Sequence, residues 1–438
     1  MKQMIFLIGT MAYFSIRGVS DPFWALLMYY GLAVLRPQAI WQWVLPEGVR
    51  WSLIGALIAI ATAIFCRRQT GEKVMDRRMI AMILMFCACL LGSYLMAMDQ
   101  DVAGTWGWEY AKILIMMLVS YFVISQRWHF RYLAWTIVLC LAYLTFEVNS
   151  LYIFEGRIDI WSHGYSGLDN NGAGLMLAML IPFLYFFFLA ESRWFRWVFV
   201  VAALATAHAV MLTYSRGAML SSIIAGAGMI LTSSKQRLRS LIVGGLVGVL
   251  ALAMAGPAVR DRFMTINESD RDASAQSRLG SWQAGWDIAK DFPVFGCGIR
   301  NSNLISKAYG ADMQGRTIHD VYIQIAADCG FPAAAIYISM ILCSLWWFRK
   351  AGQEAALHLN DKDIRWHYYI CTGAFWSMVL FSIGTVFLSM EVFELPYLLM
   401  LMGACAVNLS QPDKKSMTGD TAIIVSDPQE AIEEGART

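Results

Sequence analysis

Apolar residues fill most of this chain in long runs, which short polar segments separate. Two short pieces, Met4–Ser15 and Pro22–Leu35, come first and are split by Arg17 and Asp21. The clear runs lie near residues 51–65, 79–98, 109–125, 132–148, 171–190, 197–214, 218–232, 241–256, 321–348, 366–390 and 396–409. Because about 20 apolar residues suffice to cross a bilayer as a helix, the pattern predicts an all-α polytopic membrane protein. One crossing within residues 1–50 would give about 12 transmembrane helices.

The composition agrees with a membrane protein and excludes an ordinary soluble one. Of 438 residues, 58% are hydrophobic and only 15% are charged, whereas soluble domains have about 25% charged residues. The short alternating segments of a transmembrane barrel do not occur. Most of the nine cysteines fall inside apolar runs, so we expect no disulfide framework. The formal net charge of +2 gives no reason to expect a nucleic-acid partner.

Lys and Arg mark alternate connections between the runs. The connection 99–108 has neither residue, and 149–170 has only Arg157. Basic connections face the cytoplasm, so the polar stretch 257–320 faces outward, toward the periplasm of a Gram-negative inner membrane. The basic positions are Arg67, Arg68, Lys73, Arg77, Arg78, Arg127, Arg131, Arg193, Arg196, Lys235, Arg237, Arg239, Arg349, Lys350, Lys362, Arg365, Lys414 and Lys415.

The stretch 257–320 is too long for a turn and long enough for a small helical cap. Within it, Gln276–Lys290 is helix-like, and Asp291-Phe292-Pro293 ends that helix. Gly296-Cys297-Gly298 then predicts a flexible turn. The chain therefore divides into an N-terminal transmembrane bundle (1–256), a mostly helical periplasmic cap (257–320), C-terminal transmembrane helices (321–409) and a disordered cytoplasmic tail (410–438).

Arg216 is the first candidate for chemistry. It lies in Tyr214-Ser215-Arg216-Gly217, a tight turn joining two apolar runs on the outer side. Positive charge at the outer edge runs against the usual enrichment of Lys and Arg on the cytoplasmic side, and ionisable residues near the membrane are often functional. A guanidinium there can bind phosphate oxygens bidentately. The alternative is an arginine that reaches lipid head groups.

His319 is the histidine at which the cap re-enters the membrane, and imidazole can take a proton from a hydroxyl. The alternative is a polar helix start in which His319 and Asp320 lie near the N-cap. Arg278 begins the cap helix and shares a face with Trp282 and Trp286, although the sequence slightly favours an ordinary surface arginine at this position. Arg300 follows the glycine turn and is a weaker candidate.

Two acidic segments have structural explanations. Asp169-Asn170-Asn171 precedes an outer-side helix, where capping is the first expectation and a substrate role the second. Asp270-Arg271-Asp272 resembles the Asp-x-Asp of metal-dependent nucleotide-sugar transferases. Nucleotide sugars are cytosolic and this loop is predicted outside, so we expect a solvated turn and no metal.

Several of these segments together resemble the bacterial O-antigen ligase and O-antigen polymerase superfamily, over roughly residues 165–345. Asp320 stands where the family usually has Asn. Pro22-Phe23-Trp24 and Leu35-Arg36-Pro37 also look like the leader of a subgroup of O-glycosylation ligases. The resembling segments are the arginine turn Tyr214 to Ala218, the Asn-containing segment 169–171, the large-loop motif Arg278-x-x-x-Trp282 with Pro293-x-x-Gly296-x-Gly298, and the helix start His319-Asp320-x-Tyr322 followed by Gly330.

The resemblance implies a lipid-linked oligosaccharide glycosyltransferase of the O-antigen ligase type, which works in lipopolysaccharide biosynthesis without metal, nucleotide or other cofactor. Its donor would be a glycan on undecaprenyl pyrophosphate, and its acceptor a lipid A-core oligosaccharide hydroxyl, both among membrane lipids. Arg216 and Arg278 would hold the pyrophosphate, and His319 would be the general base of an inverting attack. The expected substrate-binding residues are Arg300, Asn171, Tyr214, Trp282 and Tyr322.

Other functions stay open at this point. Within the same chemistry, the acceptor could be a growing O-antigen chain or a protein hydroxyl. A lipid or polysaccharide transporter would favour broken helices with polar residues near mid-membrane. A structural scaffold would leave the cap arginines freely replaceable. The apolar runs are nearly free of charge and polar residues collect at the outer edge, so the sequence favours the enzyme.

Overall fold

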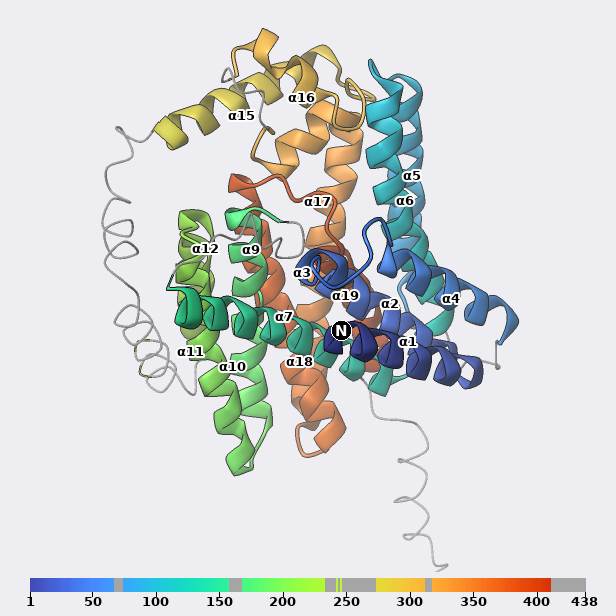
Figure 1. The fold of residues 1–438 in the computed structure, drawn as a ribbon, viewed down its shortest axis with the longest axis vertical. Coiled ribbons are helices and arrows are strands. Elements are labelled where there is room, and N and C mark those ends of the chain that lie inside the picture. Colours follow the sequence, from blue (N-terminus) through green and yellow to red (C-terminus); the bar gives the residue numbers. More distant parts are fainter. Residues whose placement is uncertain are drawn as a thin grey trace, which may run out of the picture.

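The computed structural model describes residues 1–66, 74–156, 168–232, 273–311 and 317–410, together with the backbone at 242 and 245. Every regular element in these ranges is a helix (Figure 1). This confirms the all-α prediction for the described part of the chain. The predicted run 241–256, the start of the cap and the tail lie outside the described residues.

Six helical stretches in the described ranges are long and apolar enough to cross a membrane. The chain is a polytopic membrane protein, and the count of about 12 spans remains a prediction. The long stretches are Arg77–Leu95 (α5), Arg127–Glu155 (α7), Asn170–Ala190 (α9 and α10), Trp194–Leu212 (ending in α11), Val321–His358 (α17 and a 3-10 turn) and Lys362–Phe387 (α18 and a 3-10 turn). Shorter apolar helices cover Trp51–Phe65 (α4), Arg216–Thr232 (α12) and Glu394–Leu409 (α19 and a 3-10 turn).

The N-terminal region folds as two helices with a break where the sequence predicts one. Helix α1 spans Lys2–Ser20 and helix α2 spans Pro22–Leu35. Between them, Asp21 is extended, and its carboxylate accepts a hydrogen bond of 3.0 Å from the Phe23 amide. The Asp21-Pro22 pair therefore both ends α1 and starts α2. A short helix, Pro37–Ile40 (α3), leads on toward α4.

Helices of the C-terminal region form the centre of the bundle. Helix α19 (Glu394–Ala406) is buried along its whole length from Leu395 onward. It packs against α17 (Val321–Ala355), α18 (Lys362–Gly384) and α6 (Gln100–Val123). Figure 1 shows α19 in the middle, with α5 and α6 on one side and α9 to α12 on the other. An all-round apolar helix of this kind belongs in a core.

The described part of the cap lies at one end of the bundle, above α9 and α12 (Figure 1). It consists of α15 (Ala273–Asp291), the short α16 (Ser302–Ile305) and a 3-10 turn, Ser306–Tyr309. Helix α15 contains the predicted helix Gln276–Lys290, and it ends just before Phe292-Pro293 as expected. The described cap is therefore mostly helical.

Helix α17 is broken near its outer end. Gly330 has φ +86°, and Pro332 follows inside the helix. Proline has no N–H, so the Asp328 carbonyl loses its usual helical partner. The backbone N–H groups of Cys297 and Gly298 instead donate to the carbonyls of Ala327 and Asp328, at 3.0 Å each.

The glycine turn of the cap is consequently fixed in place, so the prediction of a flexible turn is wrong. A Cβ on Gly296 would lie 2.2 Å from the Asp328 backbone, and one on Gly330 would lie 2.2 Å from the Val294 oxygen. Both positions thus require glycine, because the two backbones touch. Cys297 is buried between them. The cap is anchored on the break in α17.

Candidate active site

The segment that follows α18 contacts the predicted pieces of the site, and the hydropathy pattern does not predict it. The predicted run 366–390 treats this segment as helix, but α18 ends at Gly384. A 3-10 turn, Thr385–Phe387, follows, and the chain then stays non-helical up to α19. We call Thr385–Glu391 the connecting segment. Leu388 and Met390 are apolar, so hydropathy does not distinguish this stretch from a span.

The connecting segment contacts each predicted piece of the site. A Cβ on Gly217 would lie 3.4 Å from Phe387 Cβ, and one on Gly172 would lie 3.4 Å from Met390 Sδ. The Phe387 ring lies 6.1 Å from the Trp282 ring of α15. These contacts bring the arginine turn, the start of α9 and the cap helix around one stretch of chain.

The arginine turn is built from local hydrogen bonds. The Ser215 hydroxyl accepts from the Ala218 amide at 3.2 Å, so Ser215 caps α12 and Arg216 is its first residue. The Thr213 hydroxyl accepts from the Ser215 amide at 3.3 Å. Tyr214 between them has φ +55°, a left-handed conformation that is uncommon outside glycine.

Helix α9 begins beside this turn. Asp169 caps it by accepting from the Gly172 amide at 2.7 Å, which confirms the capping expectation. Asn171 Nδ2 lies 3.4 Å from the same carboxylate. Gly174 allows α9 to approach the arginine turn closely, since a Cβ there would lie 2.5 Å from Thr213 Oγ1. Two helix N-termini therefore lie together, and their partial positive charges favour an anion.

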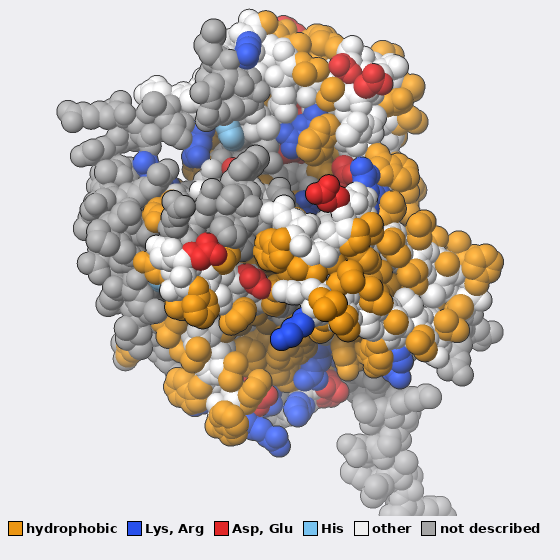
Figure 2. Space-filling view, viewed as in Figure 1, with side chains coloured by type: hydrophobic (Ala, Val, Ile, Leu, Met, Phe, Trp, Pro, Cys, Tyr) orange, Lys and Arg blue, Asp and Glu red, His pale blue; other side chains and the backbone are white. Residues whose placement is uncertain are grey.

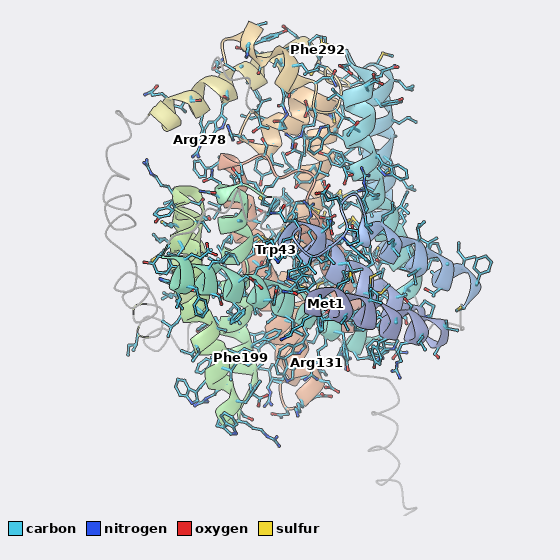
Figure 3. All side chains as sticks on the ribbon, in the orientation of Figure 1. Met1, Trp43, Arg131, Phe199, Arg278 and Phe292 are labelled. Carbon is cyan, nitrogen blue, oxygen red and sulfur yellow. The ribbon has the colours of Figure 1, made fainter. Side chains whose placement is uncertain are left out.

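Arg278 faces this region from the cap. Figure 3 shows Arg278 on the lower side of α15, above the outer ends of α9 and α12. One turn later, Trp282 Nε1 donates to the His319 carbonyl at 3.3 Å. That bond and the Phe387 contact set the orientation of α15, so the face that carries Arg278 turns toward the bundle.

His319 is held through its backbone. Its φ is +60°, its N–H donates to the Ser389 hydroxyl at 3.1 Å, and its carbonyl accepts from Trp282. The ring remains partly exposed, with Nδ1 3.4 Å from the Thr317 hydroxyl. Two separate elements, the connecting segment and α15, thus hold the backbone that carries the imidazole, and a positioned base requires such support.

Asp320 caps α17, as the structural alternative for this helix start proposed. Its carboxylate accepts from the Ile323 amide at 2.8 Å, and the residue is only 5% exposed. Burial raises the pKa of Asp320 from 3.8 to about 6, although the backbone hydrogen bonds act in the opposite direction. Asp320 is therefore the N-cap residue of α17.

A buried polar network lies beneath His319. Gln324 Oε1 accepts from the Ile318 amide (3.1 Å) and the Ser389 hydroxyl (3.2 Å). Its Nε2 donates to Ser302 Oγ (2.7 Å) and to Asp328 Oδ2 (2.8 Å). Gln324 is fully buried and Asp328 is 3% exposed. The network connects the break in α17 with the cap and with the backbone of His319.

The sequence contains a signal for this network. Gln324 and Asp328 are polar residues one turn apart inside an otherwise apolar run. The expectation that charge avoids the runs therefore fails here. A broken helix with buried polar residues is also what the transporter hypothesis favours, but these groups bond to the cap and to one another.

Arg300 forms a buried ion pair and does not extend into solvent. Its Nε lies 2.8 Å from Glu391 Oε1, with side-chain exposures of 10% and 1%. Its guanidinium also lies over the Trp106 ring, 4.4 Å from the centroid. The pair fastens the end of the connecting segment to the cap. A substrate role for Arg300 stays a prediction.

Tyr322 lies at the mouth of an apolar groove between α17 and α18. Its hydroxyl donates to the Ser382 carbonyl at 2.9 Å. Below it, Ile338, Ile341, Leu342 and Leu345 line a cavity of about 250 Å³. The groove thus continues from the helix start that carries His319 into the apolar part of the bundle.

Unusual backbone geometry clusters at the predicted site. Among the described residues, the non-glycine positions with positive φ are Arg36, Tyr214, Arg300 and His319. Three of these four are predicted site residues. Such conformations cost about 1–3 kcal/mol each and persist where the surroundings impose them, often at functional sites.

The described structure therefore brings Arg216, Tyr214, Asn171, Arg278 and Trp282 around the connecting segment, together with His319. In comparisons with known proteins, residues 201–338 match the family model described as O-Antigen ligase. Residues 1–151 match a family of unknown function, DUF5935. No curated protein matches the chain. Asn171 and the connecting segment lie outside both matched ranges.

Proposed function

From the premise that this chain carries an O-antigen ligase family domain, we propose that it transfers a glycan from undecaprenyl pyrophosphate to a lipid A-core oligosaccharide hydroxyl at the periplasmic face of the inner membrane. The observation that carries this proposal is the shared position of Arg216, Arg278 and His319. They come from three elements, and each element contacts the connecting segment.

Arg216 and Arg278 hold the donor pyrophosphate. Guanidinium groups bind phosphate oxygens in a bidentate manner and stabilise the negative charge that grows on the leaving group. The adjacent N-termini of α9 and α12 add partial positive charge on the same side. Asn171, Tyr214 and Trp282 shape the surroundings of the anion. No metal is required in this scheme, because the two arginines supply the charge.

His319 removes the proton from the acceptor hydroxyl. The hydroxyl oxygen attacks the anomeric carbon, the bond from that carbon to the pyrophosphate oxygen breaks, and the proton ends on the imidazole. Attack opposite the leaving group inverts the anomeric carbon. A general base contributes about 10²–10⁴-fold to the rate. The backbone contacts of His319 with Ser389 and Trp282 support this role, because they hold the backbone from which the imidazole extends.

The groove below Tyr322 accommodates the polyprenyl part of the donor. Its lining is aliphatic, and it starts at the same helix start as His319. An apolar chain in this groove would hold the pyrophosphate near the outer end of the bundle. The donor is thereby recognised at both ends, by charge at the pyrophosphate and by shape along the lipid.

The test is complementation of a ligase-null strain. Wild type and the variants Arg216→Ala, Arg278→Ala and His319→Ala are compared for O-antigen-capped lipopolysaccharide on gels, with membrane abundance measured for each. Arg196→Ala, at the opposite end of the bundle, is the matched control and is expected to retain the ladder. We expect the three site variants to lose the ladder at normal abundance.

Two outcomes would change the proposal in different ways. If wild type itself adds no ladder, the acceptor assignment is wrong, and transfer to a growing O-antigen chain or to a protein hydroxyl replaces it. If wild type works and all three site variants work equally well, the residues assigned to the reaction are wrong.

A further inference from the structure

A second cavity, of about 430 Å³, lies at the end of the bundle opposite the cap. It forms where the start of α7, the start of α18 and the end of α19 meet. Figure 3 shows Arg131, one of its lining residues, at the opposite end from Arg278. Lys and Arg side chains gather at this lower end in Figure 2. The basic connections predict that this face is cytoplasmic.

Two arginines of α7 give the cavity positive charge. Arg127 Nε donates to the Leu409 carbonyl at 2.9 Å. One turn later, Arg131 lies 3.3 Å from Asp363, with its guanidinium 4.7 Å from the centroid of the Trp366 ring. These contacts hold both guanidinium groups at the cavity wall. A single carboxylate accompanies two arginines among the described lining residues, so the cavity favours an anion.

The N-terminus of α7 lies at the same wall. Gln126 is its N-cap residue, and it makes no side-chain capping bond. A 29-residue helix thus begins at the cavity without a side chain that satisfies its first N–H groups. Such a terminus favours a phosphate or carboxylate through its N–H groups and its dipole.

A buried histidine supplies a separate indication of a ligand. His367 lines the cavity and is 2% exposed. Its Nε2 lies 2.9 Å from the Ala406 carbonyl, so Nε2 carries the hydrogen of that bond. Its Nδ1 is buried and has no hydrogen-bond partner among the described residues. A hydroxyl group in the cavity could donate to this nitrogen.

From these features we infer that the cavity binds a phosphate diester that also carries a free hydroxyl, which is the headgroup chemistry of phosphatidylglycerol. The phosphate contacts Arg127, Arg131 and the start of α7, and the hydroxyl donates to His367 Nδ1. A basic pocket between membrane helices on the cytoplasmic side is typical of anionic-lipid binding. This site is separate from the proposed transferase site and does not depend on it.

Binding is measured by native mass spectrometry on the full-length protein in detergent, titrated with phosphatidylglycerol, phosphatidylmethanol or phosphatidylcholine. We expect phosphatidylglycerol to bind more tightly than phosphatidylmethanol, which has the same charge but no hydroxyl, and phosphatidylcholine to bind weakest. Arg131→Gln should weaken phosphatidylglycerol binding about fivefold. Arg131 is partly exposed, so this variant should fold.

The matched control is Arg196→Gln. Arg196 also stacks on a tryptophan at this end of the bundle, 5.4 Å from the Trp197 ring, but it does not line the cavity. Binding should stay within about twofold of wild type for this variant. An equal loss in Arg131→Gln and Arg196→Gln would overturn the proposal, because it would indicate general surface attraction.

His367→Phe tests the hydroxyl contact. Phenylalanine keeps a planar ring against Phe130 but removes Nδ1. The preference for phosphatidylglycerol over phosphatidylmethanol, about fivefold for one hydrogen bond, should disappear. An unchanged preference, or none in wild type, would refute the hydroxyl contact. Competition by soluble glycerophosphoglycerol at equal concentration would identify a free phosphodiester as the source, and absence of competition would identify the lipid.

Discussion

The two ends of the bundle are held together in different ways. At the outer end, non-helical segments meet through directed hydrogen bonds, as in the contacts of Gln324 with Ser302, Asp328 and Ser389. At the opposite end, α10 packs on α18 and α11 through aromatic rings, and Phe187 lies 5.1 Å from Trp366 and 5.8 Å from Phe199. The hydrogen bonds at the outer end therefore set the relative positions of the site segments, and the ring packing at the other end stabilises the helix bundle.

The largest expected effect comes from a substitution among the aromatic rings that pack α10 against α18 and α11. Phe187 is fully buried, so Phe187→Ala leaves a cavity and should lower the free energy of unfolding by about 3 kcal/mol. Lipid cannot refill a cavity inside the bundle. The rate per folded molecule should not change, because the ring lies far from the outer end. Thermal unfolding and specific activity are measured on the same preparation, and a lowered specific activity would contradict the separation of the two ends.

The next effect concerns the break in α17. Gly330→Ala forces a side chain toward the Val294 oxygen at a positive φ. We therefore expect the free energy of unfolding to fall by about 2 kcal/mol and the transfer activity to be lost. Gly226→Ala in α12 is the control, since nothing lies within 4 Å of a Cβ there. Detergent-solubilised protein is assayed for unfolding temperature and glycan transfer. Normal activity in Gly330→Ala would show that docking of the cap on the break is dispensable.

A smaller effect separates positioning from folding. Ser389→Ala removes the acceptor of the His319 N–H, so kcat should fall about tenfold while KM for the donor stays within about twofold. Ser389→Thr keeps the hydroxyl, and the residue is partly exposed, so this variant should restore kcat. Kinetics with purified donor and acceptor distinguish the two. Equal activity of the alanine variant and wild type would remove Ser389 from the positioning of His319.

The smallest effect is a pH dependence from Asp320. Because its folded pKa of about 6 exceeds its ordinary value of 3.8, the folded state binds the proton more tightly. This contribution to stability is complete below the ordinary pKa and is lost as the pH rises through about 6. Asp320→Asn keeps a capping oxygen without the charge. Its free energy of unfolding should exceed that of wild type by about 1 kcal/mol at pH 8, after allowance for solvent screening, and should differ little at pH 4.

The control for this prediction is Asp169→Asn, which changes a second capping aspartate that is exposed. Unfolding temperatures are compared at the two pH values. A gain for Asp320→Asn that is the same at both would mean that the carboxylate of Asp320 is not penalised by burial.

The sequence predicted what depends on hydropathy and local turn chemistry. The helices near Trp51–Phe65 and Gln276–Lys290, the break at Asp21 and the cap at Asp169 all follow from apolar length and capping residues. These features are local, so a single chain segment contains the information that sets them.

What the sequence did not predict depends on contacts between distant segments. Leu388-Ser389-Met390 extends an apolar run, and only its contacts with the cap and with α17 show why it leaves the helix. The Arg300–Glu391 pair joins residues far apart in the chain. Gly330 and Pro332 lie inside the predicted run 321–348, where no break was predicted, and the Ala327 and Asp328 carbonyls needed partners from the cap to allow one.

The position of α19 has a consequence for how the protein is made. It is the last α-helix in the described chain, yet it fills the centre of the bundle (Figure 1). During synthesis, α2, α6, α17 and α18 enter the membrane before their common neighbour exists. We therefore expect these four helices to remain separated, or to pack only loosely against one another, until α19 has been made. Because α19 is the common neighbour of these helices, we expect a chain that stops before Glu394 to leave the centre of the bundle open.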